Sequence, residues 1–181
     1  KKKELDMTAE AVKVNDTSVT AGELNFFLRY QQAAFENVYG AFLKSYYGDD
    51  LFNADLDGSG VSYGVTFRGE IIEELEKMVL AEQHAEEYEI SLTDDETKAI
   101  TDAAAAFISA NGEEVLNRMS ATQENVERVL TLMTISNKIE PKMSADVDTE
   151  VPDEEAAQRT VSYVRFDAVV EEETETESEA D

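Results

Sequence analysis

The loop DLDGSGVSYGVT, residues 55–66, opens with the pattern of a calcium-binding EF-hand loop. Asp55 and Asp57 stand at its first and third positions, and a serine and a glycine follow at the fifth and sixth. An EF-hand loop ends with a glutamate that binds the ion through both oxygens, but Thr66 stands at that position here. Asp55 and Asp57 are therefore weak calcium candidates. The alternative is a flexible connector between two helices, which turn-forming residues of this kind favour.

His84 is the only histidine of the chain, and Glu87 follows three residues later on the same expected helix face. Such a pair can bind a metal, but a di-metal carboxylate bundle needs a second pair and further inward glutamates. The sequence has no second pair, so the acids around His84 indicate a solvated helix face and we expect no cofactor. No glycine-rich phosphate loop and no serine–histidine–aspartate order stands out, so the motifs assign no catalytic residue.

The aromatic residues are more informative, because eight of the fifteen lie between residues 26 and 47. One apolar stripe of a helix holds about half of them, so the others are either covered by neighbouring helices or exposed. We expect Phe27, Phe35 and Phe42 to be buried. Exposed aromatic surface marks a protein-binding site, and the candidates for polypeptide binding are Phe26, Tyr30, Tyr39, Tyr46 and Tyr47. For the tyrosines at positions 30, 46 and 47, burial and exposure both remain open.

The chain is strongly acidic, with 15 Lys and Arg against 41 Asp and Glu and a net charge of −26. This charge repels the phosphates of nucleic acids and the head groups of anionic lipids, so we expect neither as a partner. Cysteine is absent, which excludes disulfides, thiol catalysis and cysteine-bound zinc. No apolar run reaches the roughly 18 residues that a membrane-spanning helix needs.

Length and composition favour a mainly α-helical fold, since 42% of the 181 residues are hydrophobic and only eight are glycine and two proline. Capping boxes, in which a Ser or Thr and a Glu or Gln three residues later satisfy free backbone amides, mark three helix starts. The five helices are predicted from Thr20 to about Tyr47, from Thr66 or Phe67 past Ala85, from Thr93 to about Ala110, from Asn111 to Met119, and from Ser120 to Ile139. Residues 49–63 are predicted to be a loop.

Val12 and Val14 alternate with polar neighbours before the turn NDTS, which is typical of a short strand. A second alternating segment, RTVSYVRFDAVV, follows a polar connector over 141–152. We expect its residues 161–166 to pair with 12–14, so that a two-stranded element joins the N- and C-terminal segments. The helical domain then covers 10–168, between a disordered stretch over 1–9 and a disordered acidic tail over 169–181.

The order of these parts resembles the chaperone module of the SurA/PrsA group of bacterial extracytoplasmic foldases. AVKVNDTSVTAGELNFFL is similar to the group's opening strand, turn and first helix, with Asp16 where glycine is usual in a left-handed turn. SYGVTFRGEIIEELEKMVLAEQHAEEYEISLTDDE is similar to its second helix and the start of its third, and SATQENVERVLTLMTISNKIEPKM to its later helix. VPDEEAAQ is similar to the connector before the catalytic domain, and RTVSYVRFDA to the first strand of a parvulin-type prolyl isomerase.

The resemblance covers about residues 10–168 and implies an extracytoplasmic module, at the surface of a Gram-positive bacterium or secreted, that binds unfolded or newly exported polypeptides. It also implies a lipid tether on a cysteine upstream of Lys1. The histidines and apolar pocket of a parvulin domain are not found here, so no isomerase catalytic residue is carried over and the resemblance implies binding rather than catalysis. An isomerase is an alternative if the natural chain continues past Asp181.

Two other classes of function stay open. One is a structural or adhesion module of a secreted or surface protein whose aromatic side chains are all buried. The other is a binding domain weakly regulated by calcium at the loop from Asp49 to Asp57. The identity of the bound polypeptides and the oligomeric state are not indicated by the sequence.

Overall fold

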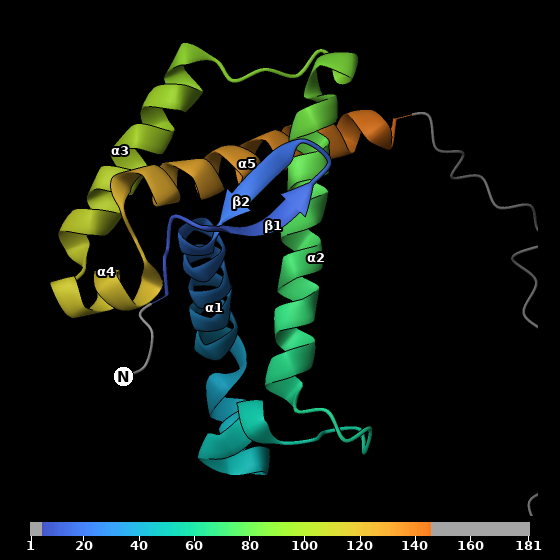
Figure 1. The fold of residues 1–181 in the computed structure, drawn as a ribbon, viewed down its shortest axis with the longest axis vertical. Helices are drawn as coiled ribbons and strands as arrows, with labels where there is room; N and C mark the ends of the chain where they lie inside the picture. Colours follow the sequence, from blue (N-terminus) through green and yellow to red (C-terminus); the bar gives the residue numbers. More distant parts are fainter. Residues whose placement is uncertain (1–4, 146–181) are drawn as a thin grey trace, which may run out of the picture. The chain divides into compact units, whose positions relative to one another are not determined.

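The computed structural model describes residues 5–145, and the segments predicted at 153–158, 161–166 and 169–181 lie outside the described residues. Within the described part the chain is mainly helical, as predicted, and a two-stranded antiparallel sheet precedes the helices (Figure 1). The α-helices are α1 (Ala21–Tyr47), α2 (Tyr63–His84), α3 (Asp94–Ala110), α4 (Glu113–Met119) and α5 (Gln123–Met143). Two short 3-10 helices, η1 (Gly48–Asn53) and η2 (Ala85–Tyr88), follow α1 and α2.

The sheet is a hairpin of β1 (Glu10–Val14) and β2 (Thr17–Thr20), with Val14 opposite Thr17. The strand predicted at 12–14 is present, but its partner in the described residues is the segment directly after the turn. Asn15 has the left-handed φ of +52°, whereas Asp16 was expected there. Asn adopts this conformation readily because its short polar side chain can hydrogen-bond locally.

The hairpin is fixed to the helices by Gln83 of α2. Its side-chain amide donates to the Val14 carbonyl and to the Thr17 hydroxyl, both at 2.8 Å. On the other side, the first amides of α1 donate to chain segments before the hairpin. Ala21 N–H donates to the Ala9 carbonyl and Gly22 N–H to the Met7 carbonyl, both at 2.8 Å. The N-terminal end of α1 is thereby held against the start of the described chain.

Two of the predicted capping boxes are confirmed. At the start of α1 the Thr20 hydroxyl accepts from the Glu23 amide at 3.2 Å, and the Glu23 carboxylate accepts from the Thr20 amide at 2.7 Å. Thr93 and Glu96 make the same reciprocal pair at the start of α3. Both motifs depend only on residues three apart, which is why the sequence alone identifies them.

The other predicted helix starts were wrong by a few residues. α2 begins at Tyr63 rather than at 66 or 67. α5 is capped by Thr122, whose hydroxyl accepts from the Asn125 amide at 3.2 Å, because Ser120 has a left-handed φ of +55° that ends α4. Asn111 does not cap α4, since its side chain donates to the Phe107 carbonyl and closes the end of α3. Helix ends of this kind depend on the turn that connects two helices, which local patterns define poorly.

The core lies where α5 packs against α1, α2 and α3. Apolar residues at helical spacing on α2 and α5 meet there, and Leu75, Val79, Val129 and Leu132 are almost completely buried. Phe27 of α1 joins them and has no exposed surface. Each of these large side chains stabilises the fold by about 1.5–3 kcal/mol through burial.

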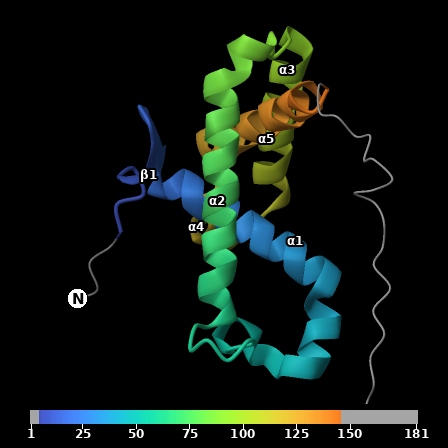
Figure 2. The same cartoon turned by 90° about the vertical axis from the view of Figure 1, so that its right-hand side faces the viewer.

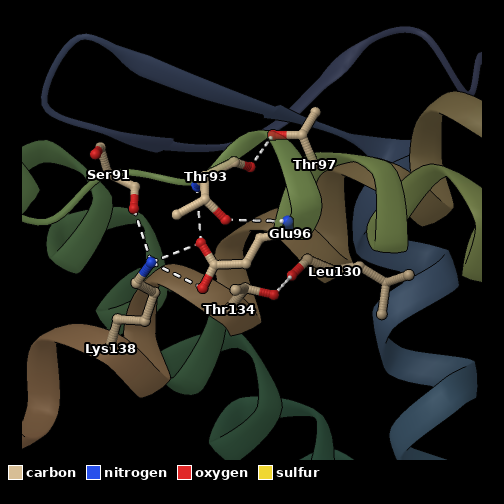
Figure 3. A network of polar contacts seen from close by, with 7 residues as sticks. All are labelled: Ser91, Thr93, Glu96, Thr97, Leu130, Thr134 and Lys138. Atoms are coloured by element: carbon tan, nitrogen blue, oxygen red, sulfur yellow. Dashed lines mark hydrogen bonds and ion pairs between the residues drawn. The ribbon is translucent and has the colours of Figure 1, made fainter.

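Two partly buried ion pairs tie the helices together. Lys138 of α5 donates to both carboxylate oxygens of Glu96, at 2.6 and 2.8 Å, and to the Ser91 carbonyl at 2.8 Å (Figure 3). These bonds hold the capped start of α3 against α5. Arg128 of α5 binds both carboxylate oxygens of Glu82 in α2, at 2.5 and 2.7 Å. The side-chain hydrogen bond to Glu82 raises the pKa of Arg128.

The distal lobe is the part of the chain from residue 34 to residue 74: the second half of α1, η1, the loop over 54–62 and the first half of α2. In Figures 1 and 2 it forms the lower end, away from the hairpin, α3, α4 and α5. η1 makes its main contacts with α1 and α2 alone. The first half of α1 contacts other parts of the fold: the Asn25 side chain donates to the Arg118 carbonyl of α4, and the Phe26 ring meets that of Phe107 in α3.

Candidate functional site

The second half of α1 carries a row of exposed apolar side chains. Val38 and Tyr39 stand four and three residues before Phe42, and Tyr46 stands four residues after it, so all four lie on one side of the helix. Their exposed fractions are 68%, 52%, 63% and 72%. We call these four residues the α1 stripe. Tyr47, which is 47% exposed, follows at the end of the helix.

The size of the α1 stripe sets it apart from scattered exposed apolar residues. A tyrosine or phenylalanine side chain has about 200 Å² to bury. The exposed fractions of its three rings thus correspond to roughly 370 Å² of aromatic surface. The largest apolar patch of a typical monomer covers about 300–600 Å² and is often functional. The stripe reaches this size on a single helix face.

A cluster of aromatic rings supports the stripe from inside the distal lobe. Phe35 of α1, Phe52 of η1, and Tyr63 and Phe67 of α2 lie with their ring centroids 5.3–6.3 Å apart. Tyr39 connects this cluster with the surface. Its ring centroid is 5.4 Å from that of Phe35, and the residue is 52% exposed. Burial, more than the nearby Glu70, raises the pKa of Tyr63, so its phenol stays neutral. The stripe therefore stands on a packed apolar base.

Within the stripe, the Phe42 and Tyr46 rings are 5.0 Å apart and inclined by 48°. Both side chains are more than half exposed, so the two rings form a small aromatic platform on the surface. Phe42 was predicted to be buried, and that prediction is wrong. Its half of α1 projects beyond the bundle core, and η1 folds back over Phe35 instead.

The polypeptide-binding candidates of the sequence fall into two separate places. Tyr39, Tyr46 and Tyr47 lie in the exposed second half of α1. Phe26 is 2% exposed and meets the ring of Phe107 in α3 edge to face at a centroid distance of 5.6 Å, so it belongs to the core.

Tyr30 lies beside Phe26, with a centroid distance of 6.1 Å, and is 37% exposed. Together with Phe107, Val129 and Met133 it borders an apolar pocket of about 190 Å³ between α1, α3 and α5. Helical spacing places Tyr30 on a different side of α1 from the stripe. Sequence reasoning did not place Val38 and Phe42 at the site. What distinguishes them is their exposure, which depends on how α3 and α5 pack around the other half of α1.

The loop that opens like an EF-hand uses its carboxylates to hold its own backbone. Asp55 accepts from the amides of Gly58 and Gly60 through its two oxygens, both at 2.8 Å. Asp57 accepts from the Ser59 amide at 3.0 Å, and hydrogen bonds from Ser59 lower the pKa of Asp57. These are the local turns that Asp side chains commonly form. Over residues 5–145, no three His, Asp or Glu side chains lie together in a way that could hold a metal ion.

His84 and Glu87 do share one helix face, with His84 Nδ1 and Glu87 Oε1 2.8 Å apart. Both side chains are more than half exposed. They border a groove of about 670 Å³ between the C-terminal ends of α2 and α5, where Leu80 and Met143 supply apolar surface. The geometry fits the solvated face that the surrounding acids indicate, and the pair adds a polar rim to the groove.

Comparison with known proteins gives no assignment: no family model, no curated protein and no solved structure matches the chain. Among the helices of residues 5–145, none combines the length and apolarity that crossing a membrane requires. The α1 stripe is thus the feature of the described chain from which a function is best argued.

Proposed function

We propose that this protein is a holding chaperone, which binds exposed apolar segments of unfolded or newly exported polypeptides outside the cytoplasm without catalysing a reaction on them. The α1 stripe supports the binding role, because exposed aromatic surface of this size is unfavourable in water unless a partner covers it. The resemblance of residues 10–168 to extracytoplasmic foldases supports the location and the class of partner.

The physical mechanism follows from the kind of surface. Aromatic side chains bury a large apolar area and have few rotatable bonds, so ordering them costs little entropy. A helix face makes no fixed set of hydrogen bonds to a partner, so it selects apolar side chains rather than a particular sequence. Charge repulsion between copies, each with a net charge of −26, keeps the exposed stripe from driving self-association.

The rival function, a structural or adhesion module, was defined by aromatic side chains that are all buried. Tyr39, Phe42 and Tyr46 are more than half exposed, which favours the chaperone proposal over that rival. The weakly calcium-regulated module draws no comparable support, since Asp55 and Asp57 already accept hydrogen bonds from their own loop.

The test measures light scattering when a chemically unfolded, aggregation-prone protein is diluted into buffer with and without this chain. The stripe variant combines Tyr39→Ser, Phe42→Ser and Tyr46→Ser. Ser has nearly the same helix propensity as Tyr and Phe, so α1 should remain folded. The control variant replaces three exposed apolar residues elsewhere, Leu80, Val115 and Met143, by Ser.

We expect the natural chain and the control variant to suppress scattering near equimolar ratios and the stripe variant to lose most of that effect. Far-ultraviolet circular dichroism and thermal unfolding establish that both variants fold. No suppression by the natural chain at several-fold excess would refute the chaperone proposal. Equal suppression by a folded stripe variant would place the binding surface elsewhere.

A further inference from the structure

We propose that the α1 stripe prefers polypeptide segments in which arginine or lysine alternates with apolar residues. This inference rests on the proposed chaperone function and specifies the chemistry of its clients, meaning the polypeptides it holds. The apolar residues of the client would cover the stripe, and its cations would meet the aromatic faces and the acidic surroundings.

The first argument is the charge around the stripe. The distal lobe, residues 34–74, contains eight acids and only two basic residues, Lys44 and Arg68. The excess extends over the whole chain, whose net charge is −26. A potential of this sign raises the local concentration of cationic segments and speeds their association. Anionic segments of the same apolar content are repelled.

Neither basic residue of the lobe lies on the stripe. Lys44 is two positions from both Phe42 and Tyr46, and residues two apart on a helix do not face each other. Arg68 borders a hollow of about 350 Å³ between α1 and α2, together with Arg29 and Gln32. Arg29 stands nine residues before Val38, the first residue of the stripe, so it lies more than two helical turns away along α1. The positive charges of the client therefore meet no cation within the stripe itself.

The second argument is the aromatic character of the surface. The platform of Phe42 and Tyr46, with ring centroids 5.0 Å apart, exposes π-faces to solvent. Tyr39 adds a third exposed ring on the same helix face. An Arg or Lys placed over such a ring gains about 0.5–1 kcal/mol at an exposed site, which corresponds to a roughly two- to fivefold gain in affinity. Arg is favoured over Lys because its planar guanidinium also stacks on rings.

Other occupants of the stripe are disfavoured by the same charge. A second copy of this chain would bring another −26 against the same surface. Nucleic acid and anionic lipid carry phosphates of the same sign as the lobe. A cationic and apolar polypeptide complements both the sign of the charge and the apolar stripe, and it is the occupant to which we commit.

The experiment measures the binding of three labelled, unstructured peptides by fluorescence anisotropy with the full chain. The peptides have the same length and the same apolar residues, and their shared polar positions carry Arg, Gln or Glu. A fourth peptide keeps the Arg residues but replaces the apolar ones by Gly and Ser. Each is measured at about 0.1 M and about 1 M salt, between which the Debye length falls from about 10 Å to about 3 Å.

We expect the Arg peptide to bind about tenfold more tightly than the Gln peptide at low salt, as two ring contacts and the attractive field would give. The advantage should fall to about threefold or less at high salt. The Glu peptide and the fourth peptide should bind most weakly. In the Tyr39→Ser, Phe42→Ser and Tyr46→Ser variant the Arg peptide should lose most of its affinity.

Equal binding of the Arg, Gln and Glu peptides would overturn this inference and leave the chaperone function standing. Binding of no peptide, together with no suppression of aggregation, would remove the chaperone function itself. Strong binding of the fourth peptide, or unchanged binding to the stripe variant, would show attraction to the acidic surface without the stripe and would also overturn the inference. The inference would also be overturned if analytical ultracentrifugation showed a dimer that has the stripe as its interface and that no peptide dissociates.

Discussion

A pair of glycines in α2 allows the packing of the distal lobe to be tested in one helix. A Cβ atom added at Gly64 would lie 2.7 Å from the carbonyl oxygen of Phe52 and 3.3 Å from the Phe52 Cβ. A Cβ atom added at Gly69 would have no neighbour within 4 Å. The Gly64→Ala and Gly69→Ala substitutions therefore make the same chemical change in two different surroundings.

The contact at Gly64 is with backbone, so it cannot be relieved by rotating a side chain. The Phe52 carbonyl belongs to η1. Directly after η1, the Ala54 carbonyl accepts a 2.7 Å hydrogen bond from the Tyr63 amide, which ties this segment to the start of α2. Relief of the clash requires η1 to move away from α2. Overpacking of this kind costs about 1–3 kcal/mol, and the gain in helix propensity offsets at most about 1 kcal/mol of it. We expect a net loss of about 1–2 kcal/mol in the free energy of unfolding.

Gly69→Ala should instead stabilise the protein by about 0.5–1 kcal/mol, because Ala is the better helix former and nothing obstructs it. The two variants should thus shift the melting temperature in opposite directions, by roughly 2–4 °C for each kcal/mol in a chain of this size. Urea unfolding followed by circular dichroism supplies the free energies. If Gly64→Ala stabilised the chain as much as Gly69→Ala, the close approach of α2 to η1 would be refuted, and with it the support beneath the α1 stripe.

Three further predictions concern the acid stability, the acidic loop and the core. The hydrogen bonds from Lys138 lower the pKa of Glu96 below its ordinary value of 4.5, so its stabilising effect is present above about pH 4.5 and lost as the pH falls through the lowered value. Glu96→Gln should flatten the acid side of a plot of melting temperature against pH, and an unchanged slope would contradict this. Millimolar calcium should leave the melting temperature unchanged, and a rise that Asp55→Asn abolishes would revive the calcium site. Leu75→Ala should cost about 2–5 kcal/mol in urea unfolding, since the side chain is fully buried; a loss below 1 kcal/mol would mean that α2 does not pack as described.

The sequence by itself determined the helical class and much of the local structure. The capping boxes at Thr20 and Thr93 were predicted correctly because each depends on hydrogen bonds between residues three apart. The first strand was also readable from its alternation. Its pairing with β2 was not predicted, because strand pairing is a contact between segments that the alternation of a single segment does not specify.

Only the tertiary structure decided which aromatic side chains of α1 are exposed. Phe26 is buried because Phe107 reaches it from α3, 81 positions later in the chain. Phe42 is exposed although Phe35, two turns earlier on the same side of α1, is covered by Phe52 of η1 and Phe67 of α2. Helical periodicity gives the angle of a side chain around its own axis but not which neighbours lie at that angle. The candidate site therefore follows from which parts of α1 the other elements cover, and that is decided by tertiary packing.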